Sequence, residues 1–294
     1  MSLNHSTVIV VGSTTMDEIR IGNKCIHKLG GVTAYAGVTY KRCGLNVWVA
    51  TNVAWSDRRI IEQLEKEGIF VCSNKTPQTT CFVNRIEGEE RTQVVSSTAR
   101  PIGASQISGI PDKADLIHLG PLHPRDVDPR VLTYLKENEF CTVLVIPGYV
   151  RKKIGNRIFP RVSDLIADAL FISSIIKGDR DEIQLVLEFF GFNLNELVEK
   201  FDIDEVVVTS GADGGYVRNK SGEEVRFRAK QAIKPGDPTG AGDVFFSMYL
   251  FHRFFKGKNI GSSAEIASIA AAAQIEGKHI SLETFRTQPS RFTL

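Results

Sequence analysis

The chain has 294 residues, of which 42% are hydrophobic and 24% charged, the proportions of a globular protein with one large core or two modest ones. Its 36 basic and 34 acidic side chains nearly balance and are scattered, which excludes the basic surface that nucleic acid or an acidic membrane would require. The cysteines Cys25, Cys43, Cys72, Cys81 and Cys141 include no C-x-x-C pair, which argues against a disulfide framework or a zinc site. A small molecule is therefore the expected ligand.

The first residues do not resemble a signal peptide. Residues 1–6 lack the required order of basic, apolar and small residues. No apolar run approaches the length needed to span a bilayer. We therefore expect a cytoplasmic protein that does not associate with membranes.

Patterns of buried strands and of helices alternate along the chain. Near-continuous β-branched runs predict parallel strands at 7–12, 47–50, 116–119, 142–146 and 205–209. Helix-like stretches are found between and after them at 58–67, 128–136, 181–188 and 262–275. The alternation predicts a three-layer α/β fold with a mostly parallel central sheet.

Two segments interrupt this alternation. Residues 17–21 and 24–28 flank Gly22-Asn23, a two-residue turn of the hairpin type. Residues 79–85 and 90–96 flank a second turn, Glu87-Gly88-Glu89, in the same manner. Both segments alternate apolar and polar residues as half-buried strands do. We predict a small β-sheet lid on the α/β body, with hairpins near 15–29 and 78–98.

The sequence Asp237-Pro238-Thr239-Gly240-Ala241-Gly242-Asp243 directly precedes an apolar run at 244–251. Its small residues let backbone N–H groups approach an anion, and the following helix directs its positive dipole end to the same place. Asp243 falls in the first helical turn, where the dipole favours an ionised carboxylate. A base beside an anion site predicts phosphoryl transfer to a hydroxyl. An ordinary loop with an aspartate that caps a buried helix is the alternative.

This segment is similar to the D-x-T-G-A-G-D signature of the ribokinase-like (PfkB) carbohydrate kinases. The resemblance implies that Asp243 deprotonates the acceptor hydroxyl, while the amides of Gly240, Ala241 and Gly242 hold the transferring phosphate. It covers nearly the whole chain and implies one kinase domain over residues 1–294, a monomer or homodimer that uses ATP and Mg²⁺. No G-x-x-x-x-G-K-[ST] motif occurs, so a Walker-type loop does not hold the phosphate.

A second segment, which begins at Gly30-Gly31 and includes Thr33 and Tyr35, opens a helix of small residues. By itself it is typical of a helix start packed on a strand. It resembles the di-glycine segment of the same family, and the resemblance implies that these four residues line the acceptor pocket. Tyr35 stands where many sugar kinases of the family have asparagine, so one polar contact to the acceptor is altered.

Asp17 matches the family aspartate that accepts hydrogen bonds from acceptor hydroxyls, a role that suits a side chain with acceptor oxygens only. A solvated acid at a strand end is the alternative. Arg91, on the second lid hairpin, could reach the acceptor hydroxyls or the transferred phosphate. An exposed arginine on a strand is the alternative there.

Residues 209–215 resemble the family segment that contacts the nucleotide, with Thr209, Gly211 and Gly214 at the matching positions. We expect Ala273 and Gly277, in and after a patch of small residues, to leave room for adenine. Core packing explains those alanines equally well.

Residues 177–182 resemble the family's K-x-N-x-x-E region, with Asp179 at the position of the asparagine and Glu182 at that of the glutamate. The resemblance implies that these acids organise water around Mg²⁺ without binding the metal directly, as suits a cation that dehydrates reluctantly. A helix N-cap with acids in its first turn is the alternative. The histidines have no partner at metal-ligand spacing, and we assign them no role.

We therefore expect an ATP-dependent kinase that phosphorylates a hydroxyl of a small sugar or polyol. Residues 173–182, 207–214 and 229–231 most resemble myo-inositol kinases, which makes myo-inositol the first acceptor to test. A ribose or nucleoside kinase of the same family and a non-catalytic, sugar-binding regulatory member are the alternatives. The presence of Asp243 argues against the non-catalytic one.

Overall fold

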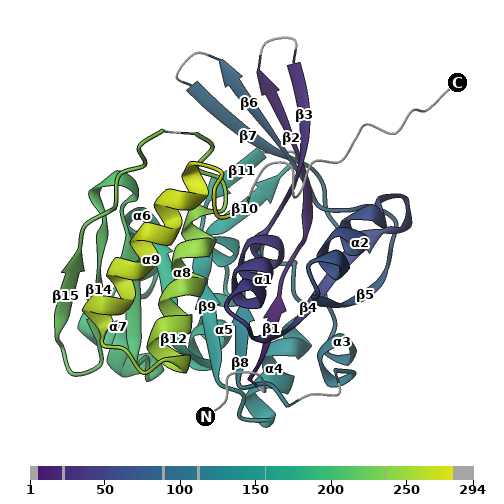
Figure 1. Cartoon of the computed structure of the whole chain (residues 1–294). Helices are drawn as coiled ribbons and strands as arrows, with labels where there is room; N and C mark the ends of the chain where they lie inside the picture. Colours follow the sequence, from purple (N-terminus) through teal and green to yellow (C-terminus); the bar gives the residue numbers. More distant parts are fainter. Residues whose placement is uncertain are drawn as a thin grey trace, which may run out of the picture.

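The computed structural model describes residues 6–21, 24–87, 90–110, 113–155, 157–234 and 236–280. It consists of an α/β body and a second sheet that projects beyond one end of the body (Figure 1). None of the described helices is long and apolar enough to cross a membrane.

The body is built on a nine-stranded sheet. In spatial order its strands are β15 (Glu224–Phe227), β14 (Gly215–Asn219), β13 (Glu205–Thr209), β12 (Ser173–Asp179), β9 (Thr142–Val145), β8 (Leu116–Leu119), β1 (Thr7–Val11), β4 (Asn46–Ala54) and β5 (Phe70–Thr76). The strands from β13 to β5 pair in parallel, whereas β14 and β15 form an antiparallel edge. The predicted mostly parallel sheet is therefore confirmed.

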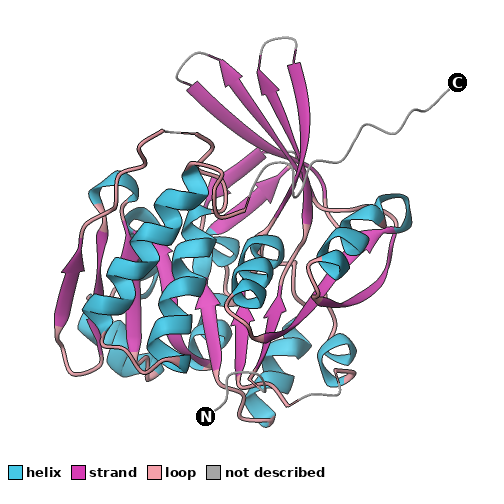
Figure 2. Ribbon diagram, viewed as in Figure 1, coloured by secondary structure: helices cyan, strands magenta, loops and turns pink. Residues whose placement is uncertain are grey.

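Helices cover both faces of this sheet, which completes the three predicted layers (Figure 2). One face is packed by α1 (Val32–Arg42), α2 (Arg59–Lys66), α8 (Ala241–Leu250) and α9 (Ile260–Ile275). The other is packed by α3 (Ala104–Ser108), α4 (Pro129–Glu137), α5 (Ile166–Phe171), α6 (Arg180–Phe190) and α7 (Leu194–Phe201). Strand β1 is buried along its whole length, as a central strand covered on both faces must be.

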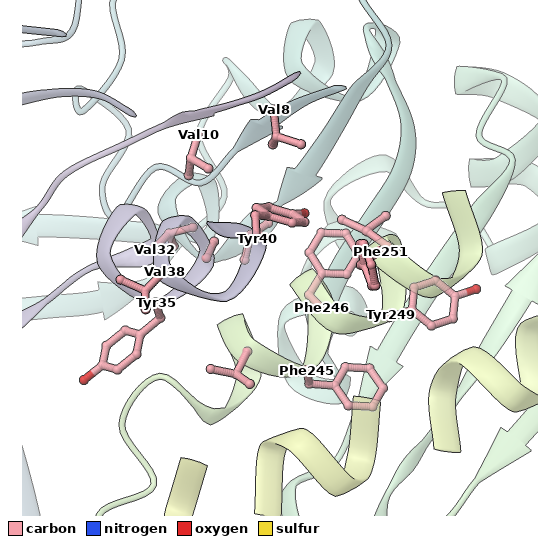
Figure 3. Close-up of a cluster of buried hydrophobic side chains, with 14 of the residues drawn as sticks. Val8, Val10, Val32, Tyr35, Val38, Tyr40, Phe245, Phe246, Tyr249 and Phe251 are labelled. Carbon is pink, nitrogen blue, oxygen red and sulfur yellow. The ribbon is translucent and has the colours of Figure 1, made fainter. Parts of the chain in front are cut away.

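Aromatic side chains of α1 and α8 form the centre of one core (Figure 3). Tyr40 of α1 and Phe246 and Tyr249 of α8 are fully buried. The buried hydroxyls are paired, because Tyr40 lies 2.9 Å from Nδ1 of His118 and Tyr249 donates to Glu205 at 2.5 Å. The hydroxyl of Tyr35 points away from this cluster (Figure 3). The first turn of α1 therefore directs this hydroxyl away from the core.

The second sheet, here called the lid, has six strands. In spatial order these are β10 (Arg151–Ile154), β11 (Arg157–Pro160), β7 (Glu90–Ser97), β6 (Cys81–Glu87), β2 (Thr15–Ile21) and β3 (Lys24–Gly30). Both predicted hairpins, β2–β3 and β6–β7, are present. The β10–β11 hairpin is an addition that the sequence analysis does not predict, and it joins the lid next to β7.

Candidate active site

Residues 237–243 form a wall between two cavities. The first, here called the lid-side cavity, has a volume of about 330 Å³ and includes Asp17, Tyr35, Gly240 and Asp243 in its lining. The second, here called the helix-side cavity, has a volume of about 620 Å³ and extends along α8 and α9. Pro238 borders both cavities. A group bound at this loop can therefore be reached from either side.

Gly240 takes a backbone conformation that favours glycine. Its φ is 79°, and a Cβ atom there would lie 2.3 Å from the ring of Tyr35. The loop before it is held by Asp237, whose Oδ1 accepts hydrogen bonds from the Thr239 amide at 2.9 Å and the Thr239 hydroxyl at 2.5 Å. These contacts fix the backbone where α8 begins.

Of the three amides that the sequence analysis assigns to the anion site, those of Gly240, Ala241 and Gly242, one is already hydrogen-bonded within the loop. The Ala241 amide donates to the carbonyl of Pro238 at 3.1 Å. Within the described part of the chain, the amides of Gly240, Gly242 and Asp243 have no acceptor, and they lie at the positive end of the α8 dipole. An anion at this helix start would be held by these three amides.

Asp243 is half-buried in the first turn of α8. Burial raises the pKa of its carboxyl to about 6, and Glu182 adds to this rise, while the positive charges of Lys177 and Arg151 oppose it. With this pKa, the carboxyl of Asp243 is ionised in most molecules at neutral pH, yet it binds a proton more readily than an ordinary aspartate. These properties suit a general base.

Lys177 is a site residue that the sequence analysis does not select. It lies on β12, only 8% exposed, and its Nζ would be 3.2 Å from a Cβ atom at Gly242. Its ammonium group therefore stands beside the free amides, in the lining of the lid-side cavity. The available signal was a lysine directly after the apolar pair Ile175-Ile176 of this strand, where a charge is costly to bury.

Asp17 lies on β2 and lines the lid-side cavity. Its Oδ1 accepts a hydrogen bond from the Phe82 amide at 3.3 Å. A Cβ atom at Gly30 would lie 2.6 Å from Oδ2 of Asp17, so glycine at that position makes room for the carboxylate. At Gly31 the φ is 87° and a Cβ atom would lie 2.2 Å from the carbonyl oxygen of Ser13. Gly31 lines the lid-side cavity and Gly30 does not, and the di-glycine segment permits close backbone packing beside the cavity.

Tyr35 lines the lid-side cavity, whereas Thr33 does not. Burial raises the pKa of Tyr35, and so do the carboxylates of Asp237, Asp17 and Asp243, which keeps the phenol protonated. Thr33 is fully buried and donates to the carbonyl of Ser13 at 3.0 Å. It stabilises the start of α1 without reaching the cavity.

An ion pair connects the lid to the loop. Nζ of Lys28, on β3, lies 2.6 Å from Oδ2 of Asp237, and Lys28 is only 5% exposed. Burial by itself would raise the pKa of Asp237, but hydrogen bonds from Lys28 and Thr239 outweigh it and lower this pKa. The lid and residues 237–243 are therefore in direct contact.

The predicted lid arginine, Arg91, lies in β7, but its side chain is outside the described part of the structure. Gln93, two residues further along the same strand, lines the lid-side cavity. The prediction for Arg91 therefore remains a prediction.

Thr209, Gly211 and Gly214 line the helix-side cavity. Gly214 has a φ of 88°, and a Cβ atom there would lie 2.2 Å from the carbonyl oxygen of Phe227. Ala273 and Gly277 are not part of the lining. The carbonyl of Ala273 instead accepts the Lys278 amide at 2.8 Å, at the end of α9.

The residues of α9 that do reach the helix-side cavity are Ser268, Ala271, Ala272 and Ile275. Their spacing places them on one face of the helix, whereas the sequence analysis selected Ala273 without assigning a face. Phe227 and residues 229–232 also line this cavity. The cavity is therefore largely apolar.

Asp179 and Glu182 form a capping box at the start of α6. The Glu182 amide donates to Asp179 at 2.8 Å, and the Asp179 amide donates to Glu182 at 2.9 Å. The second oxygen of Glu182 lies 3.8 Å from Arg151, and burial raises the pKa of this carboxyl. In the described regions no three His, Cys, Asp or Glu side chains cluster as a metal site would require.

The chain was also compared with known proteins, and residues 6–283 match the pfkB family of carbohydrate kinases. The chain belongs to this family. The chain is 32% identical over 118 residues to 5-dehydro-2-deoxygluconokinase of Bacillus licheniformis, a match that covers 39% of this chain and 35% of that protein. The match therefore spans about a third of the curated relative.

Solved structures share the fold of the kinase at low sequence identity. A pyrophosphate-dependent kinase of the ribokinase family, complexed with a pyrophosphate analog and myo-inositol, superimposes with a TM-score of 0.79 at 20% identity, over 92% of this chain and 95% of that one. Ribokinase from Thermotoga maritima superimposes with a TM-score of 0.70 at 18% identity, over 96% of each chain. The expected ribokinase-like fold is thereby confirmed.

Proposed function

We propose that this kinase transfers the terminal phosphoryl group of ATP to a hydroxyl of a small sugar or polyol. The supporting observation is the position of residues 237–243 between two cavities of different character. A donor in the helix-side cavity and an acceptor in the lid-side cavity would meet at Asp243 and the free amides. Asp243 would be the base, in agreement with the expectation from its motif.

Three side chains of the lid-side cavity, those of Asp17, Lys177 and Asp243, have a definable task in this proposal. Asp17 orients the acceptor by accepting hydrogen bonds from its hydroxyls. Asp243 removes the proton of the hydroxyl that attacks. The amides of Gly240 and Gly242, with the ammonium of Lys177, stabilise the negative charge on the transferring group.

The size and chemistry of the helix-side cavity support ATP as the donor. A volume of about 620 Å³ exceeds what pyrophosphate alone would need, and the apolar walls suit a purine ring. Thr209 and Gly211 lie where the sequence resemblance expects nucleotide contacts. Mg²⁺ bound to the donor phosphates would neutralise their charge, and Glu182 could hold its waters through the oxygen that faces Arg151.

The acceptor is expected to be no larger than a monosaccharide, since the lid-side cavity has a volume of about 330 Å³. The resemblance of three sequence segments to myo-inositol kinases supports a cyclitol. The fold neighbour complexed with myo-inositol agrees with it, although that likeness concerns the fold only.

The proposal is tested with the purified full chain, Mg²⁺, and a panel of acceptors that includes myo-inositol, ribose, fructose and adenosine. ADP release is measured for each with ATP, and phosphorylated product for each with pyrophosphate. Turnover with ATP and a polyol supports the proposal. Turnover with pyrophosphate alone would remove the ATP part, and no turnover with any pair would favour a non-catalytic member.

A further inference from the structure

A third cavity, with a volume of about 700 Å³, adjoins the lid-side cavity. Its walls are residues 123–125 after β8, residues 151–153 of β10, and residues 161–164 after β11. Arg151 borders both cavities, and Leu122 of the lid-side cavity directly precedes His123. We call this third space the basic cavity.

The lining of the basic cavity has far more positive than negative charge. It contains five cationic side chains and one carboxylate, Asp164; the cations are Arg125, Arg151, Lys152, Lys153 and Arg161. The whole chain has an excess of only two positive charges, so this concentration is local. Such a concavity attracts anions.

Most of these cations lack an internal counter-ion. As far as the structure describes the chain, no carboxylate lies within ion-pair distance of Arg125, Lys152, Lys153 or Arg161. Arg151 is 3.8 Å from Glu182. Four like charges around one space repel one another, and a bound anion would relieve that repulsion.

The walls of the basic cavity are held in place by backbone contacts. The Arg161 amide donates to the carbonyl of Val150 at 2.9 Å, and the Ser163 amide donates to that of Tyr149 at 2.7 Å. On the other wall, the buried Nε2 of His123 has no hydrogen bond among the described residues, and its nearest carboxylate oxygen, Oδ1 of Asp126, is 3.8 Å away. A buried nitrogen without a hydrogen bond is uncommon and leaves room for one to a ligand or water.

Protection of a sheet edge explains only part of this arrangement. Strand β10 is at the edge of the lid, where lysines discourage pairing with other chains, and this accounts for Lys152 and Lys153. It does not account for Arg125 and Arg161, which lie on two loops outside the strand. Their convergence from separate segments favours a binding role.

We propose that the basic cavity holds an anionic substituent, a carboxylate or a phosphate, of the polyol whose hydroxyl faces Asp243. This inference rests on the proposed kinase function and narrows its acceptor class. Arg151, at the junction of the two cavities, is placed to contact the acceptor between its reacting hydroxyl and its acidic group.

The test compares matched neutral and acidic acceptors with ATP and Mg²⁺. The pairs are myo-inositol with myo-inositol 1-phosphate, and D-glucitol with D-gluconate. Since a hydrogen bond to a charged partner is lost in the neutral molecule, we expect the acidic member of one pair to have a kcat/KM roughly tenfold to hundredfold higher. The pair that shows the preference identifies phosphate or carboxylate as the group.

A double variant, Lys153→Gln with Arg161→Gln, assigns the preference to the basic cavity. It should reduce the ratio of acidic to neutral kcat/KM by roughly tenfold or more. The matched control, Arg59→Gln with Lys66→Gln on exposed positions of α2, should preserve the ratio.

The inference is overturned if neither acidic acceptor exceeds its neutral partner, or if the double variant preserves the preference. In both cases, turnover of neutral polyols would leave the kinase proposal intact. Absence of ADP release with every acceptor would instead contradict both proposals.

Discussion

Charged side chains line the lid-side cavity, whereas the helix-side cavity is mostly apolar. Asp17, Arg151, Lys177 and Asp243 face the former. Alanines of α9 and of residues 229–232 face the latter, together with Phe227 and Phe245. Directional polar contacts select among similar hydroxyl compounds, while an apolar slot selects for the shape of a flat ring. The two cavities can therefore be altered separately, except at the wall that they share.

A change at the shared wall should have the largest effect. Asp243→Asn is nearly isosteric but cannot accept the hydroxyl proton, so turnover should fall by roughly a hundredfold to ten-thousandfold. Circular dichroism and nucleotide binding should match those of the wild type. Turnover close to the wild-type value would contradict the role of Asp243.

Gly242→Val should reduce kcat more than it raises the acceptor KM. The branched side chain would crowd Lys177 and the free amides, and loss of one such donor costs about a hundredfold or more in rate. The matched control is Gly261→Val, at the corresponding second position of α9. A larger change in acceptor KM than in kcat would disprove the anion site.

Asp17→Ala tests the lid-side cavity alone. The acceptor KM should rise roughly tenfold to hundredfold, because a hydrogen bond to a charged partner is lost, while the KM for ATP stays nearly constant. Glu18→Ala, the next residue on β2, is the control since alternate strand residues face opposite sides. Equal changes in both constants would make Asp17 a structural residue.

Ala271→Leu tests the helix-side cavity alone. The added side chain occupies space along α9 that the nucleotide would use, so the KM for ATP should rise about tenfold, which corresponds to about 1.4 kcal/mol of binding free energy. The acceptor KM should change little. Ala273→Leu, outside the lining, is the control and should leave the KM for ATP unchanged. If Ala273→Leu raises this KM more than Ala271→Leu does, adenine binds beside Ala273, as the sequence analysis predicts.

The smallest effect concerns the pH dependence of stability. The pKa of Asp243 is raised to about 6 in the folded protein, so its ionised form destabilises the fold above that pH. Asp243→Asn should therefore increase the free energy of unfolding at pH 8. We expect a gain of about 1 to 2 kcal/mol, a value that already allows for the exposure of the carboxyl to the cavity. The gain should decrease between pH 6 and pH 4. A gain that is independent of pH would contradict the raised pKa.

The same residue predicts the pH profile of activity. In the wild-type enzyme kcat/KM should fall below about pH 6, by about tenfold per unit, as the base becomes protonated. An acidic limb near the ordinary pKa of aspartate would show that the side chain is well solvated in the free enzyme.

Much of the fold follows from local sequence patterns. Strand β8 and β13 have the bounds that their apolar runs predict, and the hairpin β2–β3 surrounds the predicted turn. The β10–β11 hairpin was missed because half of its strand residues are basic, although Gly155-Asn156 between Ile154 and Ile158 is a turn signal. Pattern methods favour alternating apolar residues, which an exposed edge hairpin does not need.

The details of the site depend on contacts that the sequence does not display. The hydrogen bond of the Ala241 amide within its turn arises from backbone conformation. The burial of Thr33 away from the cavity has the same cause. Lys177 joins the site because β12 ends opposite α8, a proximity between distant segments. The motifs select Asp17, Gly240 and Asp243, and all three line the lid-side cavity: Gly240 and Asp243 belong to the short segment 237–243, and Asp17 belongs to β2.

The ion pair between Lys28 and Asp237 has a further consequence for how the donor is protected. If β3 moved away from the body, Lys28 would lose its counter-ion, and Asp237 would lose one of the hydrogen bonds that lower its pKa. The loop would then lose one of the contacts that hold it in shape. An enzyme with a raised lid would thus have an impaired anion site at the moment when water enters, and idle hydrolysis of the nucleotide would be suppressed by the same contact that assembles the site for phosphoryl transfer.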